Sequence, residues 1–159
     1  MIRQRTISVT LTDQSGDVMT LQGRLEDPFH DISISLAIDR RTLKIVSASG
    51  GMGRIPYAEG CPQSLPGLAP LAGVQIADGL SRRLRDITGG SMGCPYLSEI
   101  AEQVCRFALV LIKSDEARAA VAQGDRERFR ALRRQMGVCA GHTLAGEDDL
   151  PQWLSEERP

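Results

Sequence analysis

The first third of the chain alternates apolar and polar residues with a period of two, and no other feature constrains its fold as strongly. In the first such run Ile7, Val9 and Leu11 alternate with threonine and serine, and similar runs span residues 19–25 and 32–38. A period of two places the apolar side chains on one face of a β-strand. Short strands joined by short turns are typical of an antiparallel meander with one solvated face. We therefore predict an antiparallel sheet of about four strands.

The later part of the chain has the apolar spacing of helices instead. Leu80, Leu84 and Ile87 recur at helical intervals, and the glycines that follow them predict the end of that helix. Another helix is predicted to begin at Pro95, because proline is favoured at the first position of a helix. We expect this second helix to end or bend at Lys113-Ser114.

A last helix is predicted around Phe129, Leu132 and Met136, which would face inward. The predicted fold class is therefore α+β, with the sheet packed against three to four C-terminal helices. We expect a single α+β domain over residues 1–146. Residues 147–159 form an acidic tail that we expect to be loosely ordered or docked through Trp153.

A long segment without regular spacing, residues 47–75, joins these two halves and is rich in glycine and proline. Irregular connections of this length are uncommon in compact domains and are often functional. Two interpretations stay open, a functional loop and a passive connection from the sheet to the helices. The Gly50-Gly51-Met52-Gly53 run within it lacks the following lysine of a phosphate-binding loop.

The composition suits an ordinary globular protein, with 42% hydrophobic and 25% charged residues in a chain of 159. The formal net charge of −1 provides no overall field to attract nucleic acid or an anionic membrane. The longest apolar run, residues 107–112, is too short to cross a bilayer, and the N-terminus lacks the apolar segment of a signal peptide. We therefore expect a cytoplasmic protein with no nucleic-acid partner and no membrane partner.

Two copies of the tripeptide Gly-Cys-Pro, at residues 60–62 and 93–95, stand out within this composition. Glycine permits tight backbone turns, whereas proline fixes φ and removes an N–H donor. Each thiol is therefore expected on a shaped, irregular backbone that can present it to a ligand. In a reducing cytosol such cysteines are free, metal-bound or catalytic more often than disulfide-bonded.

Cys94 is the strongest candidate for a functional thiol and for a catalytic nucleophile. If Pro95 is the first residue of a helix, Cys94 is its N-cap, and the free N–H groups of the first turn point towards the sulfur. The helix dipole also favours negative charge at this end. Both effects favour the thiolate, which is the nucleophile and the metal ligand. The alternative is an inert cysteine that caps the helix, and we expect Cys105 to be a buried, inert residue.

A metal site is a further expectation, with zinc or iron as metals that accept thiolate ligands. Cys61 and Cys94 would supply two of the three or four ligands that such a site needs. The remaining ligands would come from His30 or from the Cys139/His142 pair. The closely paired cysteines of zinc ribbons are absent. Alternatively, the first histidine is hydrogen-bonded to a neighbouring aspartate, and the Cys/His pair belongs to a surface turn.

The order of several landmarks resembles an uncharacterised bacterial family, domain of unknown function 2889, over roughly residues 5–112. The landmarks are Asp27-Pro28-Phe29-His30-Asp31-Ile32 before a strand, Pro56 and Cys61, Leu71-Ala72-Gly73, and Gly89-Gly90-Ser91-Met92-Gly93-Cys94 before a helix. In the family a Thr-His pair usually follows the second cysteine, whereas this chain has Pro95-Tyr96 there. The resemblance implies no particular activity. The order of a strand meander and a Gly-Cys helix is also similar to iron–sulfur cluster scaffold proteins, at the level of fold alone.

Three functions are open on this basis. The first is a metal-binding or iron–sulfur-binding protein that uses Cys61 and Cys94. The second is an enzyme with Cys94 as its nucleophile and no metal. The third is a non-catalytic binding or assembly domain in which the cysteines only pack. A protein partner is open, and an edge strand over residues 5–11 or an apolar patch around Trp153 would allow a homodimer.

Overall fold

The structure is a computed structural model, which describes residues 3–135, 139–147 and 149–155. The chain divides into two compact units, Met1–Ala108 and Leu109–Pro159, and each unit is described here by itself. One long helix, α2, begins in the first unit and ends in the second.

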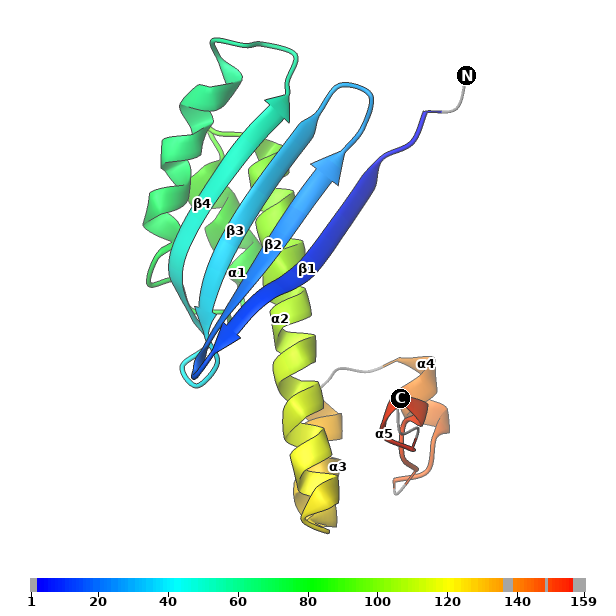
Figure 1. The fold of residues 1–159 in the computed structure, drawn as a ribbon. Helices are drawn as coiled ribbons and strands as arrows, with labels where there is room; N and C mark the ends of the chain where they lie inside the picture. The colour runs from blue at the N-terminus through cyan, green and yellow to red at the C-terminus, as the bar shows by residue number, and fades with distance from the viewer. Residues whose placement is uncertain (1–2, 136–138, 148, 156–159) are drawn as a thin grey trace. The chain divides into compact units, whose positions relative to one another are not determined.

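Four antiparallel strands form the sheet of the first unit, in the order β1-β2-β3-β4 (Figure 1). The strands are β1 (Thr6–Ser15), β2 (Val18–Glu26), β3 (Asp31–Asp39) and β4 (Lys44–Arg54). Each neighbouring pair is antiparallel, so the predicted meander in the N-terminal third is confirmed. Burial alternates along β2 and β3, because successive side chains of a strand point to opposite faces of the sheet.

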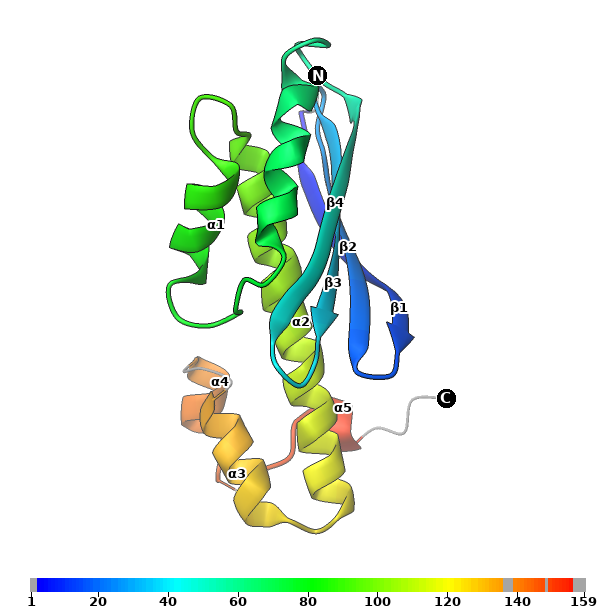
Figure 2. The same ribbon diagram turned by 90° about the vertical axis from the view of Figure 1, so that its left-hand side faces the viewer.

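Helical segments of the first unit cover one face of this sheet (Figure 2). They are the 3₁₀-helix η1 (Cys61–Leu71), α1 (Leu80–Thr88) and the N-terminal part of α2 (Pro95–Ala122). The core of this unit is aliphatic, and its fully buried side chains include Leu21, Leu25, Ile32, Ile34, Leu36, Ile38, Leu68, Leu84, Leu97, Ile100 and Val104. The opposite face of the sheet carries small and polar side chains such as Ser33 and Ser35.

Our prediction of an irregular connection over residues 47–75 is largely wrong. Strand β4 continues to Arg54, and η1 occupies residues 61–71. The glycine-rich run therefore lies inside a strand, and Gly50 has a packing role there. A Cβ atom at Gly50 would lie 2.7 Å from Leu68 Cδ1 and 2.8 Å from the carbonyl oxygen of Ser33. Glycine at this position allows η1 to lie directly on β4.

A second glycine sets the position of α2 on the sheet. A Cβ atom at Gly23 of β2 would lie 2.4 Å from Ile100 Cγ2 and 2.6 Å from Val104 Cγ2. Both distances are shorter than van der Waals contact, so only glycine permits this close approach of helix and strand. The side chains of Ile100 and Val104 fill the space above Gly23 and are fully buried.

Helix α2 runs from Pro95 to Ala122, so its predicted start is confirmed and a helix end at Lys113-Ser114 is wrong. Lys113 Nζ pairs with Glu116 Oε2 at 2.9 Å within the helix. The residues after Glu116 are rich in alanine, the strongest helix former, which explains why the helix continues.

The second unit contains α3 (Arg126–Gln135), α4 (Ala140–Leu144) and α5 (Gln152–Ser155) beside the C-terminal part of α2. Phe129 and Leu132 face inward as predicted, and they form a buried cluster with Ala117 and Ala120. Met136, which we also expected to face inward, lies outside the described residues. Trp153 packs against this cluster, as one of our two expectations for the tail requires. The division into a domain over residues 1–146 and a tail stays a prediction.

The chain is thus an α+β protein, as predicted. The described residues contain five α-helices where we expected three to four, because α4 and α5 were not anticipated. None of the helices in the described residues combines the length and the apolar composition needed to span a bilayer.

The close approach at Gly23 can be tested by adding one methyl group. We expect Gly23→Ala to lower the free energy of unfolding by about 1–3 kcal/mol, because the added Cβ overpacks the contact with Ile100 and Val104. Chemical denaturation would measure this change. Gly51→Ala is the matched control, since its Cβ would meet only Ser33 Oγ at 3.5 Å. Equal effects of the two substitutions would contradict the packing role of Gly23.

Candidate functional site

The two Gly-Cys-Pro segments both open helices, and their thiols line the same cavity. Cys61 is the first residue of η1, and Cys94 directly precedes the first residue of α2. The cavity has a volume of about 470 Å³ and is formed entirely by residues of the first unit. Cys61 and Cys94 are free and partly buried. The structure therefore brings together two thiols that are far apart in the sequence.

The walls of this cavity are largely apolar, with a few polar groups among them. The apolar part comes from Ile32, Met52, Ile55, Pro56, Tyr57, Met92, Pro95 and Tyr96, and the polar part includes His30, Gln63, Ser64 and Ser91. Tyr57 and Met92 are 73% and 69% exposed, respectively. A partly apolar cavity with a few polar groups is typical of a small-molecule site.

A glycine-rich turn between α1 and α2 fixes the position of Cys94. The backbone N–H of Cys94 donates to the carbonyl oxygen of Thr88 at 2.9 Å. A Cβ atom at Gly93 would lie 2.2 Å from the carbonyl oxygen of Gly89 and 2.3 Å from that of Thr88, so no larger residue fits. The buried hydroxyls of Thr88 and Ser98 lie 2.5 Å apart and join the end of α1 to the first turn of α2.

The position of Cys61 is fixed by hydrogen bonds of its backbone. Its N–H donates to the carbonyl oxygen of Tyr57 at 2.9 Å, and its own carbonyl oxygen accepts a 2.7 Å bond from Ser64 Oγ. Pro62 follows in the first turn of η1. The two Gly-Cys-Pro segments thus place cysteines at helix N-termini by related means, but the second helix is a long α-helix and the first a short 3₁₀-helix.

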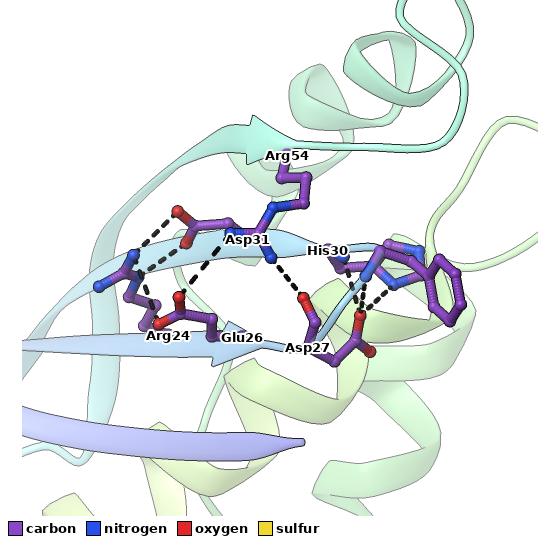
Figure 3. Close-up of polar contacts among 7 residues, drawn as sticks. Arg24, Glu26, Asp27, His30, Asp31 and Arg54 are labelled. Atoms are coloured by element: carbon purple, nitrogen blue, oxygen red, sulfur yellow. Dashed lines mark hydrogen bonds and ion pairs between the residues drawn. The ribbon is translucent and has the colours of Figure 1, made fainter. Parts of the chain in front are cut away.

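His30 lines the same cavity and is held by Asp27, in the tight turn between β2 and β3 (Figure 3). Asp27 Oδ1 lies 3.0 Å from His30 Nδ1 and accepts 2.8 Å bonds from the backbone N–H groups of Phe29 and His30. Arg54 Nη1 donates to the carbonyl oxygen of Asp27 at 2.5 Å and joins the end of β4 to this turn. The expectation that a neighbouring aspartate binds His30 is confirmed, and Asp27 is that residue.

Arg5 and Tyr96 complete this polar cluster. In the sequence, Tyr96 stands out only as the residue that replaces the family's usual histidine, and Arg5 was not anticipated at the site. Arg5 donates to Asp27 Oδ2 through Nε and Nη2, at 2.9 and 2.7 Å. The guanidinium carbon of Arg5 lies 4.9 Å from the ring centre of Tyr96. The rings of Tyr96 and His30 are 4.6 Å apart. Tyr96, which stands where the resemblance places a histidine, therefore packs against His30 at the wall of the cavity.

The electrostatic state of Asp27 follows from these contacts. Burial alone would raise the pKa of its carboxyl group, since the side chain is only 4% exposed. The backbone N–H of Phe29, the guanidinium of Arg5 and the ring and N–H of His30 outweigh burial and hold this pKa well below its usual range. Asp27 is therefore a carboxylate at neutral pH. An imidazole that donates its Nδ1–H to this carboxylate keeps Nε2 as a proton acceptor.

The other cysteines and the second histidine do not belong to this cavity. Cys105 is fully buried, as predicted, and burial raises the pKa of its thiol to about 12. Cys139 and His142 belong to the second unit. Cys139 is exposed and precedes α4, and His142 lines a different cavity beside Arg133 and Arg134.

The donor set expected for a metal does not assemble in the part of the chain that the structure describes. Cys61, Cys94 and His30 line one cavity, yet no three His, Cys, Asp or Glu side chains of these residues form a group that could hold a metal ion. Zinc sites in proteins use at least three side-chain ligands. Metal binding by the expected ligands stays a prediction; these are Cys61, Cys94, His30, Cys139 and His142.

The sequence model of a protein family described as "Protein of unknown function (DUF2889)" matches residues 4–109. The chain belongs to this family. The match confirms the resemblance seen in the sequence and includes every residue that lines the cavity around Cys61 and Cys94. No curated protein and no solved structure matches the chain.

The role of Asp27 predicts a specific dependence of stability on pH. Its pKa is lower in the folded chain than the value of about 3.9 expected in the unfolded chain. Between these two values the unfolded chain binds more protons, so stability rises with pH and is lost as the pH falls through the folded value. We expect Asp27→Asn to lower the melting temperature at neutral pH and to flatten the decline of melting temperature in acid.

Thermal unfolding over a series of pH values would measure this effect. Asp86→Asn is a suitable control, because Asp86 is 68% exposed in its side chain and pairs only loosely with Arg82 at 3.7 Å. In this control, the melting temperature should decline at acid pH in nearly the same way as in the wild type. An unchanged acid limb in Asp27→Asn would show that the contacts of Asp27 do not stabilise the fold.

Proposed function

We propose that this protein is a thiol-dependent enzyme that acts on a small, largely apolar substrate with an electrophilic carbon. One observation carries the proposal: Cys94, Cys61 and His30 line the same cavity, and Asp27 holds the imidazole of His30. Cysteine enzymes combine a thiol, an imidazole and a third group that orients the imidazole. The volume of about 470 Å³ suits a small organic molecule.

Cys94 is the better of the two thiols for the nucleophile. It directly precedes a helix of 28 residues, whereas Cys61 opens a 3₁₀-helix of 11 residues. The free N–H groups and the dipole at the start of a long α-helix stabilise a thiolate. Gly93 and Thr88 fix the backbone of Cys94, so the sulfur is presented from a rigid turn.

The reaction supported by these groups is acyl transfer. His30 Nε2 takes the proton of the Cys94 thiol, and the sulfur forms a bond to the carbonyl carbon of the substrate. The bond to the leaving group then breaks, and the leaving group takes the proton from His30. Water next attacks the thioester with His30 as base, which releases the acid and restores the thiol. Asp27 keeps His30 oriented and stabilises its charged form throughout.

Metal binding is the second candidate, because two thiols and an imidazole line one cavity and zinc and iron accept both donors. The absence of a three-ligand group among the described residues weighs against it. Elemental analysis of protein purified without chelator separates the two candidates. We expect no more than traces of zinc or iron in the wild type and in Cys61→Ser and Cys94→Ser. Near-stoichiometric metal that both substitutions remove would favour the metal site over the enzyme.

The reactivity of the four thiols tests the nucleophile. We expect iodoacetamide near neutral pH to label Cys94 several-fold faster than the exposed Cys139, because His30 lines the cavity of Cys94 and would accept the proton of its thiol. Cys105 should stay unlabelled in the folded protein, since it is fully buried. Mass spectrometry of peptides after timed quenching would give each rate. Equal rates at Cys94 and Cys139 would argue for a non-catalytic domain whose cysteines only pack.

Substitutions around the cavity test the roles of the remaining groups. On a substrate found by screening thioesters and activated esters, Cys94→Ser should abolish turnover, and His30→Ala should lower kcat by about a hundredfold or more. Cys139→Ser, in the second unit, is the matched control and should keep full activity. Retained turnover in Cys94→Ser would overturn the assignment of the nucleophile.

A further inference from the structure

The two edges of the sheet differ in how their backbone groups are satisfied. At the β4 edge, Ile45 N–H donates to Val74 O at 3.0 Å, Gly73 N–H donates to Ile45 O at 2.7 Å, and Ile76 N–H donates to Leu43 O at 2.8 Å. The segment before α1 thus covers the start of that edge, at residues 43–45. On the other side β1 is the outermost strand, and β2 is its one neighbour among the described strands (Figure 1). The β4 edge is therefore covered in part, whereas the described strands leave the outer side of β1 open.

Over Thr6–Leu11 the open strand has none of the usual features that prevent pairing with another chain. Proteins protect free edges with charged residues, proline, a bulge or a very short strand. Strand β1 is 10 residues long, and its segment Thr6–Thr12 contains no charge, no proline and no glycine. The one irregularity lies beyond Leu11, between Leu11 and Asp13. An uncharged edge segment rich in threonine, valine and isoleucine pairs readily with another strand.

The apolar residues of β1 are also incompletely covered. Ile7, Val9 and Leu11 lie opposite Leu25, Gly23 and Leu21 of β2, so they share the face that carries the core. Ile7 and Val9 are only half-buried, and Leu11 is 37% exposed. In contrast, Leu21 and Leu25 on the next strand are fully buried. A further strand beside β1 would extend the apolar layer over these three side chains.

We infer that two copies of this chain pair through β1, antiparallel and about a two-fold axis at Val9. This pairing joins two four-stranded sheets into one continuous sheet of eight strands. Val9 then lies opposite Val9 of the second copy, and Ile7 lies opposite Leu11 in both halves of the interface. The interaction is a contact between identical surfaces, as in most symmetric dimers.

The sequence of β1 favours this pairing register over the registers shifted by one residue or less. An axis between two residues would place the apolar residues opposite threonine and serine, on the wrong face of the sheet. An axis at Ser8 would pair Ile7 with Val9 but place Leu11 opposite Arg5. Only the axis at Val9 pairs all three apolar residues of each strand with apolar residues.

Charge at the two ends of the strand supports an antiparallel second copy. Arg3 precedes the N-terminal end of β1 and Asp13 lies near its C-terminal end, whereas Arg5 and Asp17 are already paired with Asp27 and Arg41. Antiparallel pairing brings the basic end of each strand to the acidic end of the other, whereas parallel pairing would bring like charges together. Residues 6–12 between these ends are uncharged, so the apolar pairs form without burying a charge.

Two matched double variants test this inference on the exposed face of β1, where Ser8 of one copy lies opposite Thr10 of the other. Ser8→Lys/Thr10→Lys places lysines opposite each other in both halves of the interface. Ser8→Lys/Thr10→Glu places lysine opposite glutamate instead. Ser8 and Thr10 are both exposed, so neither variant disturbs the core. Sedimentation velocity of the full chain over a concentration series, with circular dichroism to verify folding, would measure the dimer.

We expect a dimer for the wild type and for the lysine–glutamate variant. The dissociation constant of the lysine–lysine variant should be larger by about tenfold or more, because like charges directly opposite each other destabilise a pair of strands. A wild type that is monomeric at every concentration would overturn the inference. The same holds if the two variants dissociate equally, because pairing about Val9 requires them to differ. Cys94→Ser should remain dimeric, which separates this interface from the proposed thiol chemistry.

Discussion

The contact of α2 with the sheet at Gly23 is the constraint on which the rest of the first unit depends. Because no side chain separates β2 from Ile100 and Val104, the helix axis has one position along the strand. Pro95 starts that helix, so the position of α2 also sets where Cys94 stands. The hydroxyls of Thr88 and Ser98 then tie the preceding turn to the helix. A glycine in the middle of a strand thus determines the place of a thiol at the end of the helix.

Asp27 has a comparable role at the turn between β2 and β3, because it organises the backbone that presents His30. One carboxylate oxygen accepts from the backbone of the turn and from the imidazole, and the other accepts from Arg5. A buried carboxylate is stable only when such donors replace water. The contacts that offset the free-energy cost of burying this carboxylate also fix the ring of His30. The same interactions therefore stabilise the turn and orient the imidazole in the cavity.

The sequence predicted most of the fold of the first unit and only part of its site. The strand pattern and the proline at residue 95 gave the meander and the start of α2, because both signals are local. Local patterns could not show that β4 extends through Gly50, since that glycine is required by a contact with η1. The convergence of Cys61 and Cys94 was predicted from their shared tripeptide. Arg5 and Tyr96 were missed, because only the pairing of distant segments brings them to Asp27 and His30.

Arg5 joins the open edge of the sheet to the thiol cavity. It directly precedes β1, its guanidinium binds Asp27, and it lies over the ring of Tyr96. Its side chain is 42% exposed, and the strand that follows it is paired with β2 over residues 6–15. Because Asp27 orients His30, the edge strand and the cavity wall share one chain of contacts. The inferred interface at the edge would therefore lie next to contacts that hold the groups of the proposed chemistry.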